Sequence, residues 1–362
     1  MIMTTRRKAV PLLAALAISP TVLAQSTQTI EEIVVTAQKR EQSQQDVPIS
    51  VAAFTGEMAE TAGAYNITGI NGIAPNIVLQ TEGLVPNVPM FAIRGMSHSD
   101  PDPNSDPKIS TVIDGVYVPY VAASLLDLFD LERVEVLRGP QGTLFGKNNL
   151  AGTVNITTAR PTGELGGRVR ATLGDNGLRH YRARIDSPSF ADGTMAAKLS
   201  LSKRDYDGYA TNITTGSELG GNDVIAARGT LTFMPAGAFD ATLIVDYTKD
   251  ETDGPPGYSL GVPEIQDDVY EVALSFDPYI ETETLGVTLQ ANWALGDGNV
   301  ALVAGHRDLE YLNRGDFDGL PNQPGLDVTR DFDGDYQSLE LRYSSPLEGR
   351  FELEKRVALF AA

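Results

Sequence analysis

Oxygen-bearing side chains recur at every second position within residues 97–107, and oxygen ligands of this kind can bind calcium. They are Asp100, Asp102, Asn104 and Asp106. An EF-hand loop also needs a glycine at its sixth position and a glutamate at its twelfth, where this chain has Ser105 and Thr111. We therefore expect no metal site here. The three prolines of the stretch predict a loop.

Glycines between residues 139 and 152 could instead cradle a phosphate. A P-loop requires Gly-x-x-x-x-Gly-Lys-Ser/Thr, but Gln141 replaces the first glycine and Asn148 replaces the hydroxyl residue. On either side, Val134, Val136, Val154 and Ile156 alternate with polar residues, which predicts two half-buried strands. The glycines are expected to serve positive φ angles and close backbone packing, not nucleotide binding.

No residue pattern predicts catalysis or a cofactor. The three histidines, His98, His180 and His306, are scattered, and the pair Asp331 and Asp333 is more typical of solvated loop charges than of a glycosidase. A net charge of -20 argues against a nucleic-acid partner, which needs a basic face. The chain has no cysteine and therefore no disulfide or thiolate site.

Four stretches of the chain share one resemblance. Residues 131–160, LERVEVLRGPQGTLFGKNNLAGTVNITTAR, resemble the end of the plug domain of TonB-dependent outer-membrane receptors. Residues 91–96, FAIRGM, and 112–118, VIDGVYV, are similar to earlier parts of that plug, and residues 30–37, IEEIVVTA, resemble its TonB box. The resemblance covers residues 30–160 in the order of the family.

The resemblance implies roles for particular residues. The TonB box would comprise Ile30, Glu31, Glu32, Ile33, Val34, Val35, Thr36 and Ala37. Two plug arginines of the family meet barrel glutamates and lock the plug, and Arg94 and Arg138 match their positions; their partners would lie in later strands. The glycines of the plug turns would be Gly95, Gly115, Gly139, Gly142 and Gly146. His98 and Asp100 are the candidates for ligand contact because such loops cap the plug's outer face.

The start of the chain predicts export. Residues 1–24 combine Arg6, Arg7 and Lys8 with a short apolar run and a small-residue cleavage site, as in a cleaved signal peptide. Residues 25–46 are rich in Gln, Thr and Glu and should form a mobile tether. Their apolar island, 33–35, suits strand addition to the edge of another protein's sheet.

Residues 47–162 predict a small α+β domain, the plug, which begins with a strand, a helical segment and a second helical turn ending at Pro75. Residues 163–362 then alternate apolar and polar positions in ten-residue strands, with short and long connections in turn, as in an outer-membrane β-barrel. We expect about eight antiparallel transmembrane strands and an unfinished ninth. Leu243, Val245, Leu289 and Ala291 should face lipid, and Ile244 and Gln290 should face the lumen.

The fold class expected is therefore an α+β plug followed by an incomplete antiparallel transmembrane β-barrel, whose family form has 22 strands. The resemblance implies a receptor in the cell outer membrane, not an enzyme, that takes up a ferric siderophore or other iron complex with energy from TonB. A chain ending after about eight strands would be truncated and unable to transport. Two alternatives stay open within membrane transport: a passive porin-like channel and a receptor for cobalamin or a glycan. A secreted β-rich hydrolase is a third.

Overall fold

A computed structural model describes most of the chain after residue 33. The described residues are 34–36, 38–40, 42–72, 74–83, 85–98, 102, 105–124, 130–257, 268–322, 326–345 and 354–361. The expected signal peptide and the first part of the tether lie outside them. In the described part, no helix is long and apolar enough to cross a membrane.

A five-stranded sheet forms the centre of the first unit, here called the plug. Its order is β3 (Val51–Thr55), β9 (Leu131–Arg138), β10 (Gly152–Thr158), β7 (Ile109–Ile113) and β8 (Val116–Val118). The two edges of this sheet are therefore β3, which follows the tether, and β8. Strands β9 and β10 pair in antiparallel fashion, and β10 runs parallel to β7.

Strands β9 and β10 were expected to be half-buried, and this was wrong. Val134, Val136, Val154 and Ile156 are buried, and so are the alternate residues Glu135 and Asn155. One face packs on the main apolar cluster of the plug. The other face is covered by the chain segment that precedes β3, which periodicity within the strand could not reveal.

Short helices surround this sheet. The helix α1 (Gly56–Thr61) begins where the Thr55 hydroxyl accepts a hydrogen bond from Met58 N–H, a typical N-cap. The turns η1 (Ile67–Ile70), η2 (Val121–Ser124) and α2 (Gly142–Phe145) complete the helical part, and η1 ends before the expected Pro75. A second sheet joins β4 (Ile77–Glu82), β5 (Val85–Ile93) and β6 (Met96–His98), so the expected loop at 97–107 begins as a strand.

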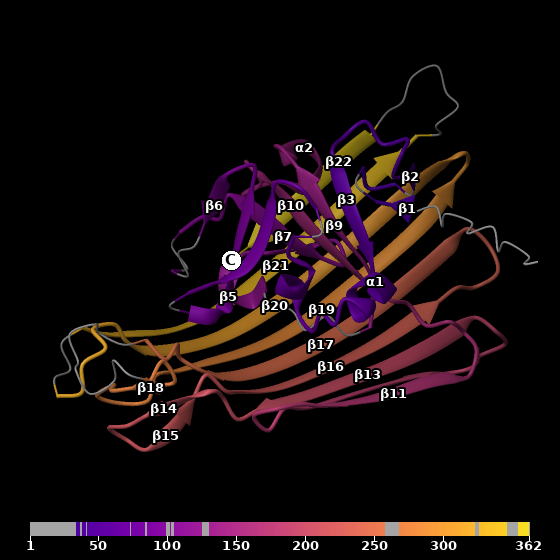
Figure 1. Cartoon of the computed structure of the whole chain (residues 1–362). Helices are drawn as coiled ribbons and strands as arrows, with labels where there is room; N and C mark the ends of the chain where they lie inside the picture. Colours follow the sequence, from indigo (N-terminus) through magenta and orange to yellow (C-terminus); the bar gives the residue numbers. More distant parts are fainter. Residues whose placement is uncertain are drawn as a thin grey trace, which may run out of the picture.

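Nine antiparallel strands form a separate, curved sheet, here called the wall. They are β11 (Gly166–Leu173), β12 (Arg179–Asp186), β13 (Met195–Tyr206), β16 (Asn222–Phe233), β17 (Phe239–Asp253), β19 (Tyr279–Leu295), β20 (Gly298–Asp316), β21 (Asp327–Ser344) and β22 (Glu354–Ala361). Each strand pairs with the next, and the plug lies against the concave side (Figure 1). The sheet is a partial barrel that does not close.

The wall strands differ in length from the ten residues expected. The strand β20 has 19 residues and β21 has 18, whereas β11 and β12 have 8 each. In the longer strands, backbone pairing continues past the apolar band into polar sequence. The connections alternate as predicted between short turns, such as 296–297, and long loops, such as 254–278.

The two faces of the wall differ in polarity. Leu243, Val245 and Leu289 are each about two-fifths exposed on the convex side, as expected for lipid-facing residues. Ala291 shares their face but is buried. Ile244 lies on the other face and is buried, so this position, predicted to face the lumen, is covered.

Two long loops fold together at one end of the wall. The hairpin β14 (Ala210–Asn212) and β15 (Ser217–Leu219) pairs through β14 with β18 (Glu271–Val272) from a different loop. Leu219, Val272 and Leu274 form a small apolar core beneath them. The described parts of the two loops therefore pack together as a small cap.

Candidate functional site: the tether dock and the plug–wall contacts

The tether segment is docked against the plug. The strand β1 (Val34–Val35) pairs with β2 (Gln42–Ser43) of the same chain. Val35 is fully buried and packs in a cluster with Leu137 and Phe145, while Val34 is 43% exposed. The expectation of a mobile tether is therefore wrong for the described residues from Val34 onward. Burial of the Val35 side chain stabilises the docked tether, and composition alone did not predict this contribution.

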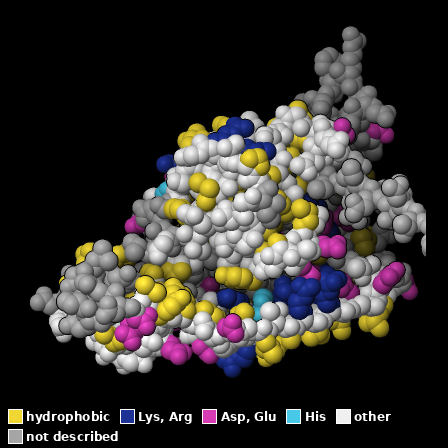
Figure 2. All heavy atoms as spheres, in the orientation of Figure 1, with side chains coloured by type: hydrophobic (Ala, Val, Ile, Leu, Met, Phe, Trp, Pro, Cys, Tyr) yellow, Lys and Arg dark blue, Asp and Glu magenta, His cyan; other side chains and the backbone are white. Residues whose placement is uncertain are grey.

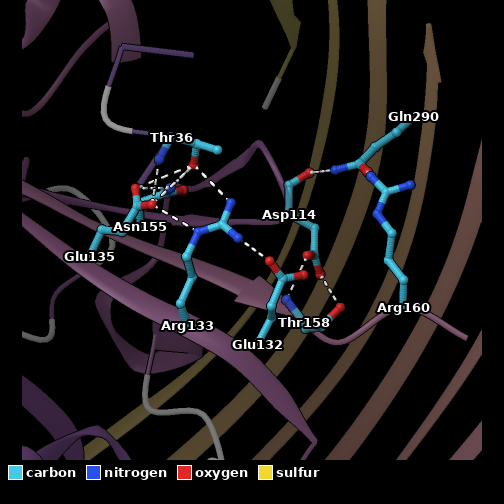
Figure 3. A network of polar contacts seen from close by, with 9 residues as sticks. All are labelled: Thr36, Asp114, Glu132, Arg133, Glu135, Asn155, Thr158, Arg160 and Gln290. Carbon is cyan, nitrogen blue, oxygen red and sulfur yellow. Dashed lines mark hydrogen bonds and ion pairs between the residues drawn. The ribbon is translucent and has the colours of Figure 1, made fainter. Parts of the chain in front are cut away.

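Thr36 and Glu135 hold the tether in place (Figure 3). The Thr36 N–H donates to Glu135 Oε1 at 2.6 Å. Arg133 Nε and Asn155 Nδ2 also donate to the Glu135 carboxylate, each at 2.9 Å, so this fully buried charge is paired and hydrogen-bonded. A buried carboxylate is costly unless it is satisfied in this way. Glu135 lies between two valines in β9, a position for which strand alternation alone predicts exposure to solvent, whereas the structure buries it in this dock.

Five residues of the expected TonB box are not described. Ile30, Glu31, Glu32, Ile33 and Ala37 lie outside the described residues, so the box as a whole stays a prediction. Only its later part, Val34 to Thr36, is placed, and it is the part that contacts the plug.

The two arginines expected to lock the plug lie near each other. Arg94 is exposed, and its Nη1 lies 3.5 Å from where a Cβ on Gly139 would be. Arg138 donates to the Pro75 carbonyl at 3.2 Å. The lock with barrel glutamates stays a prediction. The plug glycines Gly95, Gly115, Gly139 and Gly146 have positive φ, whereas Gly142 begins α2.

The ligand-contact candidates are only partly placed. His98 ends β6 and lines a narrow recess with Phe91 and Ile109, while Asp100 lies outside the described residues. No group of metal-binding side chains occurs among the residues described.

A larger cleft opens between the plug and the loop end of the wall. Its volume is about 350 Å³, and its lining includes Tyr65, Arg204, Tyr206 and Asp253. The Arg204 guanidinium lies 4.0 Å from the centre of the Tyr65 ring, so one contact joins plug and wall there. Sequence reasoning missed this cleft because its two sides are more than a hundred residues apart.

One region of the plug–wall interface, here called the socket face, is apolar and closely fitted. A Cβ built on Gly305 of β20 would lie within 2.5 Å of both methyls of Val116. The ring of Tyr120 similarly occupies the space above Gly334 of β21. Next to these sockets, the rings of Tyr117 and Tyr336 meet edge to face at 5.8 Å. Burial raises the pKa of Tyr117 to about 12, so this phenol stays neutral.

The turn between β7 and β8 anchors this face. Asp114 and Gly115 both have positive φ, and the Asp114 carboxylate accepts hydrogen bonds from Thr158 N–H and Oγ1. Gln290 of β19 donates to the Asp114 carbonyl at 2.7 Å and accepts from Arg160 at 2.6 Å (Figure 3). Burial raises the pKa of the Asp114 carboxyl, against the lowering effects of Thr158 and Arg228. The wall position Gln290, predicted to face the lumen, therefore contacts the plug.

The opposite region, here called the ionic face, joins the plug to β11, β12 and β13 through charges. Glu60 of α1 pairs with Arg168 at 2.9 Å and Arg170 at 3.1 Å. Asp130 pairs with Lys198 at 2.7 Å, and both side chains are only 2% exposed. Ser200 donates to Asp130 at 2.7 Å, and Arg184 lies 3.4 Å from it. Figure 2 shows basic side chains gathered where the plug faces the wall.

The fold and these contacts define a class: a plug seated on the concave side of an antiparallel wall whose convex side is apolar, as in plugged outer-membrane barrels. Residues 43–153 match the family model of the TonB-dependent Receptor Plug Domain. This part of the chain is therefore a plug domain of the kind found in TonB-dependent receptors.

Individual relatives support this assignment. The pesticin receptor of Yersinia pestis is 29% identical over 199 residues, which cover 49% of this chain and 29% of that protein. The ferrioxamine B receptor of Salmonella typhimurium is 26% identical over 170 residues, 46% of this chain and 23% of that one. The crystal structure of the ferric yersiniabactin uptake receptor FyuA from Yersinia pestis superposes with a TM-score of 0.74 at 21% identity, covering 86% of this chain and 48% of FyuA. The chain thus spans about half the length of that solved receptor and less than a third of the relatives' sequences.

Proposed function

We propose that this protein acts in active uptake across the outer membrane, as a receptor for a ferric siderophore or another iron complex, and that it is not an enzyme. The observation that carries the proposal is the plug of the TonB-dependent family lying inside a wall with an apolar convex side. The names of the relatives, which include a ferrioxamine B receptor, support iron as the cargo. A cleaved signal peptide over residues 1–24 would deliver the chain to the membrane.

TonB is the proposed energy source, and residues 30–37 are its proposed binding site. Strand addition would use the backbone of this segment, with affinity from main-chain hydrogen bonds. Because Val34 and Val35 already pair with Gln42 and Ser43, TonB would have to replace β2 as their partner or use the residues before them. Val34 is partly exposed, and β1 and β2 pair over only two residues. Replacing β2 by a strand of TonB would therefore break few contacts.

Replacing Val34 by proline tests this proposal. Proline removes one N–H from the ladder, so Val34→Pro should abolish binding of the isolated TonB C-terminal domain and, in a full-length version of the receptor, energised iron uptake. Val34→Ala keeps the N–H and serves as the matched control, with binding retained. Binding is measured by calorimetry and uptake with radioactive iron in cells with and without TonB. Unchanged TonB binding by the proline variant would exclude this site.

The cargo is tested by growth. A deletion strain should lose growth on one iron source and keep growth on single cobalamin or glycan sources. Loss on cobalamin or a glycan alone would favour a receptor for that ligand. Uptake that persists without TonB would favour a passive channel.

A further inference from the structure

An apolar groove runs along the convex side of the wall, over the strands β19 to β22. Its volume is about 600 Å³, within the range of roughly 300–1,000 Å³ that is typical of ligand sites. Ala304 of β20 forms its floor, and Leu289 and Leu339, the residues directly opposite Ala304 on the neighbouring strands, form its sides. Both leucines are about two-fifths exposed. The groove therefore opens on the side of the wall that is expected to contact lipid.

A histidine lies at one end of this groove. His306 follows Ala304 by two residues on the same face of β20, toward the long-loop end, and pairs with Val287 and Gln337. Its Nδ1 atom is buried, and the imidazole has no hydrogen-bond partner among the described residues. On a lipid-facing side this is costly, because no water replaces the missing bonds. A neutral imidazole offers one donor and one acceptor, so an amide or hydroxyl group of a lipid suits it better than an ester, which only accepts.

Carboxylates follow the groove toward the long loops. Asp308, on the same face as His306, lies directly opposite Asp335, and Glu310 lies directly opposite Asp333. All four are exposed, and like charges that face each other across two strands repel. A bare phosphate is therefore disfavoured here, whereas Mg²⁺ is commonly bound by one or two carboxylates together with phosphate oxygens. Since the described residues include no group of three or more metal-binding side chains, the remaining ligands of such an ion would have to come from the lipid.

We propose that this groove binds an acyl chain of lipopolysaccharide, the phosphorylated glycolipid of the outer leaflet, whose chains carry amide and hydroxyl groups. The chain packs over Ala304, its amide or hydroxyl group bonds to His306, and a divalent cation joins its phosphate to Asp308 and Asp335. The long loops of outer-membrane barrels face the cell exterior, so the polar end of the groove lies toward the leaflet that holds this lipid. The inference goes beyond uptake and rests on the outer-membrane location proposed above.

Lipid binding is measured by native mass spectrometry on a full-length version of the receptor. The protein is delipidated and then given, with Mg²⁺, either lipopolysaccharide of short sugar chain, phosphatidylethanolamine or phosphatidylglycerol. We expect one bound lipopolysaccharide, held about tenfold more tightly than either phospholipid. A phospholipid that binds as tightly would overturn the assignment.

Two variants test the groove itself. Ala304→Leu fills the floor and His306→Leu removes the hydrogen-bonding group, and each should weaken lipopolysaccharide binding about tenfold. Both introduce apolar side chains on a lipid-facing side, so neither should disturb folding. Ala241→Leu on the same side of β17, two residues from Leu243, is the matched control and should bind as the wild type does. Wild-type affinity in Ala304→Leu and His306→Leu would overturn the inference.

The cation is tested in the same assay with EDTA, which should release lipopolysaccharide from the wild type. Asp308→Asn with Asp335→Asn removes the repulsion, so this double variant should bind with and without EDTA. Glu251→Gln with Glu281→Gln changes another directly opposed pair, on β17 and β19, and should keep the wild-type response. Wild-type binding that survives EDTA would overturn the cation bridge.

Failure of this inference and failure of the proposed function give different results. Loss of lipopolysaccharide binding in no groove variant, with TonB-dependent uptake intact, would remove only the lipid site. Membrane fractionation that finds the receptor outside the outer membrane, or wild-type uptake that does not need TonB, would instead remove the proposed function.

Discussion

The socket face and the ionic face hold the same plug to the same wall by different physical means. At the socket face, shape decides: Val116 and Tyr120 occupy space that only glycine leaves open. Each such side chain gains about 1.5–3 kcal/mol from burial, and this gain is lost as soon as it moves out. At the ionic face, charge decides: the part-exposed Glu60 pairs contribute about 0–1 kcal/mol each, whereas Asp130 and Lys198 form a buried pair that must stay matched. The same plug is thus held on one side by shape and on the other by charge.

The largest effect should come from stranding a buried charge on the ionic face. Lys198→Met removes the main partner of Asp130 and should lower the free energy of unfolding of the plug by about 3–5 kcal/mol. The double variant Lys198→Met with Asp130→Leu should regain most of this loss, because no unpaired charge remains. Urea unfolding followed by proteolysis measures both. A double variant as unstable as the single would mean that the pair itself, not its desolvation, holds this face.

Filling a socket should have the next largest effect. Gly305→Ala and Gly334→Ala each place a methyl group against a plug side chain and should cost about 1–3 kcal/mol in the same assay. Gly229→Ala in β16 is the matched control, because nothing lies within 4 Å of its Cβ position. Val116→Ala should partly rescue Gly305→Ala by removing the two clashing methyls. Equal stability of the Gly305 and Gly229 variants would contradict the description of a socket.

The exposed pairs of the ionic face should respond weakly to mutation and clearly to salt. Glu60→Gln should cost less than about 1 kcal/mol. Raising the salt concentration to 1 M should increase hydrogen exchange of α1 in the wild type, because the Debye length falls to about 3 Å, and should leave the β7–β8 hairpin unchanged. In Glu60→Gln the salt response of α1 should disappear. If 1 M salt increased hydrogen exchange of the hairpin as much as that of α1, the two faces would not differ in the way described.

The smallest effect should be a pH response at the socket face. Burial raises the folded-state pKa of Asp114, so the folded plug binds this proton more tightly than the unfolded chain does. Stability from this group therefore falls as the pH rises from the usual aspartate pKa through the raised value, and returns on acidification. Hydrogen exchange of β7 and β10 across that range, compared with Asp114→Asn, isolates the contribution. The Asn variant should show a flatter pH profile.

Local patterns in the sequence determined much of the fold. Two-residue alternation predicted the wall strands, because side chains of a strand point alternately to its two faces. Turn glycines such as Gly115 and Gly139 followed from the need for positive φ. The family resemblance of residues 131–160 placed the plug strands β9 and β10. Strand lengths were less predictable, since pairing beyond the apolar band depends on the neighbouring strand.

Contacts between distant parts of the chain were decided only by the tertiary structure. Thr36 meets Glu135 across 99 residues, and Val116 meets a glycine 189 positions later, with no local pattern to announce either contact. From the sequence alone, a glycine in a strand indicates only a weak strand former. Its role as a socket becomes visible when the structure shows which side chain occupies the space beside it. The same holds for Glu60 and Asp130, whose partners lie on the wall. Sequence periodicity fixes which way a side chain points, and tertiary packing decides what it meets there.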